Sequence, residues 1–136
     1  MFILKTDYGD AIRTNILDDI VEADDTLIDK ASKSSISLMK GYLNARYDTN
    51  AIFNATDDAR HPNVLEFGVD IALYDLHRRI NPRKVPAIRA ERYKVAKEWL
   101  MDVSEGVINP PDLPLAANGA KDYINLGSNT KRDNYI

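Results

Sequence analysis

Three side chains that can take part in proton transfer stand close together in the stretch DIALYDLHRR. Asp70, Tyr74 and His77 are four and three residues apart, which places them on one side of a helix. A histidine beside a carboxylate can act as a general base. However, the chain has no cysteine and no Gly-x-Ser-x-Gly turn, and the neighbouring residues are strongly apolar. We therefore expect these groups to hold a central helix in place, and we predict no catalytic residue.

Metal and cofactor sites are not expected either. His61 and His77 are far apart in the sequence, and neither belongs to a His-Glu-x-x-His pattern. The stretch DDTLIDK is acidic, but it lacks the glycine and the final glutamate of a calcium-binding loop. The chain also contains no glycine-rich phosphate-binding loop.

The apolar residues recur with a helical period in four segments. We expect one or two short helices at 6–22, capped by Thr6 and broken near Asn15, and a long helix at 24–46, capped by Asp24 or Asp25. Small serines on the long helix would let another backbone approach closely. Further helices are expected at 62–80 and 86–105, and the Asn- and Asp-rich residues 47–61 are predicted to form a loop.

The segment 62–80 is apolar around most of its circumference, so this helix should lie at the centre of the fold. Pro62 suits its first position, and Pro82 disfavours its continuation. A carboxylate at Asp70 would then be buried, which is costly without a partner. We predict that Arg46, or failing that an arginine near the following turn, pairs with Asp70.

These patterns predict an all-α protein: a small bundle of four to five helices over residues 1–106, followed by an extended C-terminal arm, residues 107–136. The arm begins after Gly106, a plausible helix C-cap, and is rich in proline and asparagine. It still carries apolar residues that we expect to bind a partner: Val107, Ile108, Leu113, Leu115, Tyr123, Ile124, Leu126, Tyr135 and Ile136.

Charge is unevenly distributed along the chain. Residues 1–59 hold 11 acidic and 6 basic side chains, whereas Arg78 to Lys97 contains eight basic residues and one acidic residue, Glu91. Such a chain suits head-to-tail self-association, although solvated helix faces also explain the charges. The candidates for a subunit interface or for a surface facing a DNA channel are Arg78, Arg79, Arg83, Lys84 and Arg89.

The composition sets broad limits. The chain has 136 residues, 44% of them hydrophobic, which fits one globular domain. The first residues lack the features of a signal peptide, no stretch is long and apolar enough for a membrane span, and cysteine is absent. We therefore expect a protein made in the cytoplasm, with no membrane contact.

Three blocks of the sequence resemble one family. LMKGYLNARYD (38–48), VLEFGVDIALYDLHRR (64–79) and RAERYKVAKEWLMDVSEGVI (89–108) are similar to a family of small proteins of tailed phages and prophages. Its Mu-like members are often described only as a domain of unknown function. The resemblance covers about residues 1–108, and the 47–61 loop departs from it because the family has an apolar, proline-containing loop there.

The resemblance implies a head–tail connector, also called an adaptor or head-completion protein. Such proteins are helical bundles that form homo-oligomeric rings, commonly twelvefold, beneath the portal protein in the virion neck. They continue the DNA channel and offer a docking surface to a tail protein or second neck protein. The expected role is therefore structural, not enzymatic. The alternative is a small helical regulatory protein that binds a protein or nucleic acid through the basic 78–97 region.

Overall fold

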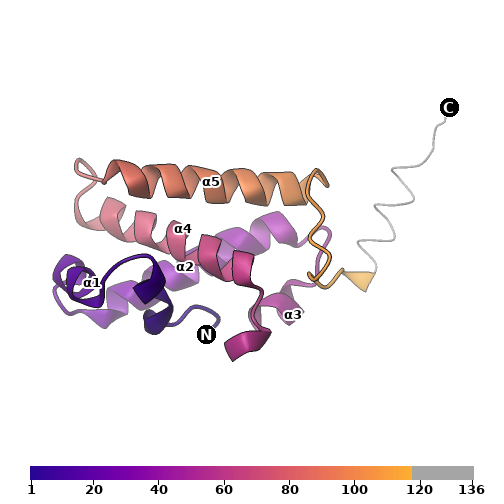
Figure 1. The fold of residues 1–136 in the computed structure, drawn as a ribbon, viewed down its shortest axis with the longest axis horizontal. Helices are drawn as coiled ribbons and strands as arrows, with labels where there is room; N and C mark the ends of the chain where they lie inside the picture. The colour runs from indigo at the N-terminus through magenta and orange to yellow at the C-terminus, as the bar shows by residue number, and fades with distance from the viewer. Residues whose placement is uncertain (118–136) are drawn as a thin grey trace.

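The structure is a computed structural model that describes residues 1–117 of the chain. Within this range it contains helices and a single isolated β-bridge, which confirms the predicted all-α class. The elements are η1 (Lys5–Asp10), α1 (Thr14–Val21), α2 (Asp25–Leu43), α3 (Thr49–Phe53), η2 (Asp57–Ala59), α4 (Pro62–Ile80) and α5 (Ala87–Ser104), where η denotes a 3-10 helix (Figure 1).

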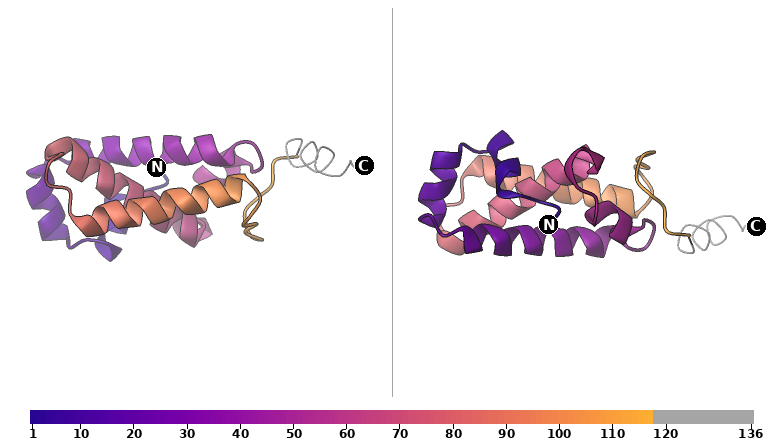
Figure 2. Two further views of the ribbon diagram at one scale, coloured as in Figure 1. Left: turned by 90° about the horizontal axis from the view of Figure 1, so that it is seen from above. Right: turned by 90° about the horizontal axis from the view of Figure 1, so that it is seen from below.

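Helix α4 occupies the centre of the fold, as the sequence predicted. It contacts α1, α2 and α5, and the views from above and below show α2 and α5 lying along it (Figure 2). Its buried residues fall on several sides of the helix, among them Val64, Ile71 and Leu76. Pro62 stands in its first turn, and the helix ends at Ile80, before Pro82. Here local signals and burial agree, so the predicted bounds are the observed ones.

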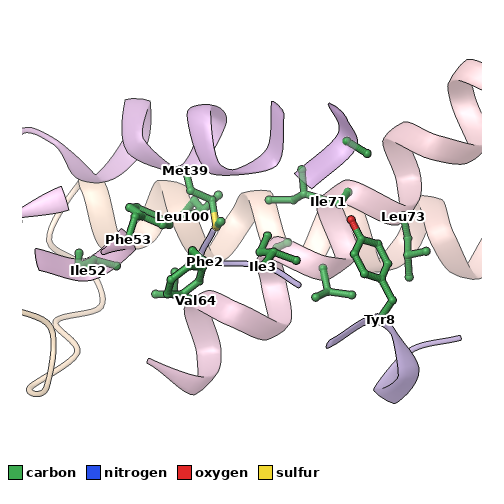
Figure 3. Packing of buried hydrophobic residues seen from close by; sticks show 14 of the residues in the cluster. Phe2, Ile3, Tyr8, Met39, Ile52, Phe53, Val64, Ile71, Leu73 and Leu100 are labelled. Carbon is green, nitrogen blue, oxygen red and sulfur yellow. The ribbon is translucent and has the colours of Figure 1, made fainter. Parts of the chain in front are cut away.

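The N-terminal residues complete the core. Phe2 and Ile3 are 2% and 1% exposed, and Figure 3 shows them next to Val64 and Met39. The Phe2 ring meets the Phe53 ring edge-on, with centroids 5.1 Å apart. The first ten residues therefore close one side of the bundle between α2 and α4.

Two serines of α2 let the neighbouring segments approach closely. Ser35 Oγ donates to the Gly68 carbonyl on α4 at 2.7 Å, and a Cβ on Gly68 would lie only 2.7 Å from Met39 Cε. Ser32 Oγ lies 2.7 Å from the hydroxyl of Tyr8, a fully buried residue of η1. Burial raises the pKa of the Tyr8 phenol to about 12, so this hydroxyl stays protonated. The close approach expected of the serines is confirmed within the subunit.

The helices differ from the predictions in four places, of which the first is α2, because it ends at Leu43 instead of residue 46. Thr6 lies inside η1, which begins after Leu4, and Asn15 lies inside α1 instead of breaking it. The predicted 47–61 loop contains α3 and η2. Asp48 explains α3, because its side chain accepts the Ala51 N–H at 3.1 Å and caps the helix. A run of asparagine and aspartate thus supplied a cap as well as turns.

Other termini follow the sequence closely. Asp24 caps α2 by accepting the Thr26 N–H, and Gly106 follows α5 with a φ of 81°, a conformation that favours glycine. None of the helices within residues 1–117 is long and apolar enough to cross a bilayer. Residues 1–117 thus make a helical bundle whose order of elements is largely the one predicted.

Candidate interface groove

The three side chains that suggested acid–base chemistry each have a separate partner. His77 Nδ1 lies 2.9 Å from the Leu73 carbonyl of its own helix. The Tyr74 ring stacks on Tyr93 of α5, with centroids 4.1 Å apart and an interplanar angle of 14°. Asp70 is 4% exposed and bonds to α5. Within the described residues, no hydrogen bond joins Asp70, Tyr74 and His77 to one another. Asp70 and Tyr74 instead connect α4 to α5, whereas His77 bonds within α4.

The partner of Asp70 is Arg92 on α5, so the predicted pair with Arg46 is wrong, and the alternative, an arginine near the turn after α4, agrees better with the structure. Arg92 donates to Asp70 Oδ2 from Nη2 at 2.8 Å and from Nε at 3.1 Å, and Nη2 also reaches Glu66 Oε2 at 2.8 Å. The hydrogen bonds to Asp70 raise the pKa of the Arg92 guanidinium above its usual range. Arg92 stands at i−4 from the buried Ala96, on the inner side of α5, and this spacing was a signal that sequence reasoning missed.

Arg46 has a different structural role. Its Nη1 donates to the Val103 carbonyl near the end of α5 at 3.0 Å, and its Nη2 donates to Asn109 Oδ1 at 2.8 Å. The side chain therefore ties the segment after α2 to the end of α5 and to the chain that follows it.

The first part of the predicted arm packs on its own bundle. Leu113 is 4% exposed and belongs to the core, so its assignment as a partner-binding residue is wrong. The Asp48 N–H donates to the Pro114 carbonyl at 2.9 Å, and the Ala116 N–H donates to the Arg46 carbonyl at 3.1 Å. In contrast, the remaining described arm residues of the predicted set are exposed: Val107, Ile108 and Leu115. The other five, which are Tyr123, Ile124, Leu126, Tyr135 and Ile136, lie outside the described residues.

The five predicted basic residues differ in their surroundings. Arg78 and Arg79 both bind Asp75, at 2.6 and 2.7 Å. Arg83 and Lys84 stand exposed on the α4–α5 turn, and no ion pair is formed by either within residues 1–117. Arg89 lines a groove instead.

This groove runs between η1, α4 and α5 and has a volume of about 610 Å³. Its floor is the side of α4 that carries Leu65 and Val69. Asp10 and Ala11 stand on the η1 side, and the first turn of α5 forms the opposite wall. The groove thus leaves part of the central helix without a covering element, and it joins apolar surface to charges of both signs.

Arg89 is the unsatisfied group of this groove. Its Nη1 is buried and has no hydrogen-bond partner within the described part of the chain. Asp18 Oδ1 is the other buried atom without a hydrogen bond, but Lys5 Nζ lies 3.0 Å from it. A buried donor without an acceptor costs about 1–3 kcal/mol, and more when it is charged. Beside Arg89, the α5 residue Ile88 is 53% exposed. The Ile88 side chain therefore offers an apolar contact on this wall, whereas Arg89 Nη1 is enclosed by the surrounding atoms of the chain.

No cluster of three or more metal-binding side chains occurs within residues 1–117. The groove contains carboxylates, but Asp70 and Glu66 are held by Arg92, and Asp7 is held by Arg60 at 2.7 Å. The groove therefore combines carboxylates that are held by arginines with apolar side chains such as Leu65 and Ile88.

Comparison with known proteins identifies the family. The family described as Bacteriophage Mu, Gp36 matches residues 4–122, a range that contains every helix of the bundle and the whole groove. Comparison with curated proteins gave no match, and comparison with solved structures gave none either. Because the match covers most of the sequence, we conclude that the chain belongs to the bacteriophage Mu Gp36 family of phage proteins.

Proposed function

We propose that this phage protein is a virion structural component of the neck. In this proposal it forms a homo-oligomeric ring, twelvefold as in the connectors that its sequence resembles, between the portal protein and the tail or a second neck protein. The ring continues the DNA channel. The protein acts by binding and carries out no reaction.

One observation supports this proposal. In the single subunit, the groove leaves one side of α4 partly uncovered by other elements. Part of α4 is uncovered, and the buried Arg89 Nη1 has no acceptor within residues 1–117. Buried polar groups in folded proteins nearly always have a partner. In this proposal, a second protein surface fills the groove and covers exposed apolar side chains such as Ile88.

Exposed apolar residues on α5 support the same proposal. Ile88, in the wall of the groove, is 53% exposed, and Val95 and Met101 elsewhere on the helix are 38% and 44% exposed. Single exposed apolar residues are ordinary, so the argument depends on Ile88, which stands beside the groove.

Opposite charges alone do not define the ring contact. The basic α4–α5 turn lies at the same end of the bundle as the acidic α1 (Figure 1), whereas η2 carries the exposed Asp57 and Asp58, so acidic residues occur in more than one part of the bundle. A closed ring needs two different surfaces related by a constant rotation. The groove provides one of them, on the side of α4 between η1 and α5.

Electron microscopy of the purified chain, and of virion necks carrying a labelled copy, tests this proposal. We expect closed rings of uniform diameter, and label at the head–tail junction. A chain that stays monomeric at high concentration and with purified portal protein, and that is absent from virions, would refute it.

The exposed Arg83 and Lys84 favour the second candidate, a regulatory protein that binds nucleic acid. A gel shift at physiological salt separates the two functions. Binding in the nanomolar range that is lost in an Arg83→Ala, Lys84→Ala variant, together with absence from virions, supports the regulatory function.

A further inference from the structure

We infer that the groove binds the outer side of α2 of a second copy of this chain. This inference rests on the proposed function, because it names the contact between neighbouring subunits. Figure 2 shows α2 along one edge of the bundle, where no other element within residues 1–117 covers its outer side. Six exposed residues on this side and at the C-cap of the helix form what we call the lysine face: Lys30, Lys33, Ser37, Lys40, Gly41 and Asn44.

The lysine face carries positive charge and no carboxylate. Lys30, Lys33 and Lys40 are exposed, and none of them forms an ion pair within the described residues. Lys40 Nζ lies over the Phe53 ring, 5.9 Å from its centroid, which is not a contact with a negative group. The lysine face therefore offers three ammonium groups to the carboxylates of another molecule.

The groove presents the opposite charge, because four carboxylates and two guanidinium groups line it. Two of the carboxylates, those of Asp7 and Asp70, are largely buried and are held by arginines of their own subunit. Asp10 is exposed and forms no ion pair within residues 1–117, and the Glu66 side chain is 63% exposed. Asp10 and Glu66 are thus the carboxylates that ammonium groups of a second copy can reach.

The lengths of the two surfaces agree. Lys33 and Lys40 are seven residues apart, which is about 10.5 Å along α2. The groove follows α4 from Pro62 to Asp70, which are eight residues or about 12 Å apart. Both lysines therefore fit within the groove when α2 lies along it. Their methylene groups then cover the apolar floor, while their ammonium groups stay near the carboxylates.

The shapes of the two surfaces agree as well. Ile88 stands in the groove wall and is 53% exposed, so it can insert into a neighbouring surface. A hole that receives such a side chain is formed on a helix by residues at positions i, i+3, i+4 and i+7. The lysine face provides such a hole, made by Ser37, Lys40, Gly41 and Asn44.

The packing of its own subunit does not require Gly41. A Cβ at this position would meet nothing within 4 Å, so alanine would fit. Glycine also destabilises a helix relative to alanine. Insertion of Ile88 from a second copy explains the glycine, because a side chain at position 41 would close the hole.

Duplex DNA is the other occupant that suits the lysine face, because lysine and serine side chains also bind phosphate groups. A contact with DNA would leave the exposed Ile88 and the groove carboxylates without a partner. Contact between two copies covers both surfaces at once. The lysine face and the groove are different surfaces of one subunit, so their repeated pairing can close a ring.

Cysteine cross-linking tests the contact, because the chain has no cysteine of its own. Two full-length variants, Ser37→Cys and a tagged Ile88→Cys, are mixed and oxidised. We expect the mixed disulfide dimer to form about tenfold faster than with Ala90→Cys, an exposed α5 residue outside the groove, in place of Ile88→Cys. Equal rates in the two mixtures would overturn the inference.

A charge exchange tests the pairing of the lysines with the groove. Lys33→Glu with Lys40→Glu, in the chain that carries the α2 cysteine, should slow the cross-link about tenfold. Asp10→Lys in the other chain should restore part of the rate. Asp58→Lys, at an exposed aspartate of η2 outside the groove, should restore none of it. Circular dichroism checks that each variant is folded, and equal restoration by the two aspartate variants would refute the pairing.

Gly41→Leu tests the hole. The subunit leaves open space at this position, so the urea midpoint should not fall. The leucine fills the hole, however, so the cross-link should slow about tenfold. A cross-link as fast as that of the parent chain would remove Gly41 from the contact and overturn the inference.

Fluorescence anisotropy with a short DNA duplex at physiological salt tests the other occupant. DNA binding that is abolished by Lys33→Glu with Lys40→Glu, together with equal cross-linking in the two mixtures, would assign the lysine face to DNA and overturn the inference.

The failure of this inference is distinguishable from that of the proposed function. Rings in the electron microscope without the Ser37–Ile88 cross-link leave the neck function standing and remove this contact. Absence of rings and of virion incorporation removes the function itself.

Discussion

Replacing Arg92 by leucine removes the partner of the buried Asp70 carboxylate. The variant leaves Asp70, whose side chain is 6% exposed, without its two hydrogen bonds from Arg92. Removing one partner of a fully buried pair costs about 3–5 kcal/mol. The Arg92 side chain is 33% exposed, so water screens part of the interaction, and we expect a loss of about 2–3 kcal/mol in the free energy of unfolding.

Urea unfolding measures this loss. The single tryptophan, Trp99, packs on Phe67 with ring centroids 5.0 Å apart, so its fluorescence reports on the contact between α4 and α5. With a denaturant slope of about 1–3 kcal/mol per molar urea, a loss of about 2–3 kcal/mol lowers the midpoint by about 0.7–3 M. Arg83→Leu, at an exposed residue of the turn, is the control and should shift the free energy of unfolding by less than about 0.5 kcal/mol.

A double-mutant cycle then tests the cause. Asp70→Asn removes the buried charge, so adding it to Arg92→Leu should recover stability, with a coupling of at least about 1 kcal/mol. The cycle of Arg46→Leu with Asp70→Asn should be additive within about 0.5 kcal/mol, because Arg46 binds the Val103 carbonyl and Asn109 instead. A large coupling to Arg46, or none to Arg92, would refute the assignment of the pair.

Three further changes have defined outcomes. Tyr8→Phe should lower the free energy of unfolding by about 1–2 kcal/mol, because the hydroxyl of its serine partner on α2 loses a buried hydrogen bond; an unchanged urea midpoint would contradict this. Leu113→Ala should lower the free energy of unfolding by about 2 kcal/mol or more, because Leu113 is buried. Leu115→Ala, at a 58% exposed residue, should lower it by less than about 0.5 kcal/mol. Equal losses for the two variants would argue against the burial of Leu113 in the core. The hydrogen bond from His61 lowers the pKa of Asp112, so this contact stabilises the fold above the ordinary aspartate pKa and is lost as the pH falls through the lowered value. The amide protection factors of residues 112–116, which correct the exchange rates for their intrinsic pH dependence, should fall in this range in the wild type and stay constant in Asp112→Asn.

The sequence predicted most reliably where a local signal and a burial pattern agree. Helix α4 begins and ends where Pro62 and Pro82 indicate, and its apolar circumference predicted its central position. The short helix α3 was missed because a five-residue helix has too few turns to show a period. Here Asp48 acts as a cap within a stretch whose composition resembles a loop.

The long-range pair could not be predicted in the same way. Sequence shows that a buried Asp70 needs a cation, but it does not show which arginine the packing of α4 and α5 brings to it. Arg46 and Arg92 were equally available by type. The position of Arg92 on the inner stripe of α5 was the one local signal, and it becomes decisive only when the contact between α4 and α5 is known.

The sequence also does not show which of the basic residues are exposed in the fold. This difference between the basic residues allows an experiment to separate the two candidate functions. Arg83 and Arg89 look alike in the sequence, because both belong to one run of positive charge. In the fold, Arg83 stands in solvent, whereas Arg89 holds a buried donor in the groove. Binding to nucleic-acid phosphates draws on exposed cations and weakens with salt. Assembly through the groove draws on a donor shielded from water, which salt screens much less. Reversing Arg83 should therefore affect only the first activity, and reversing Arg89 only the second.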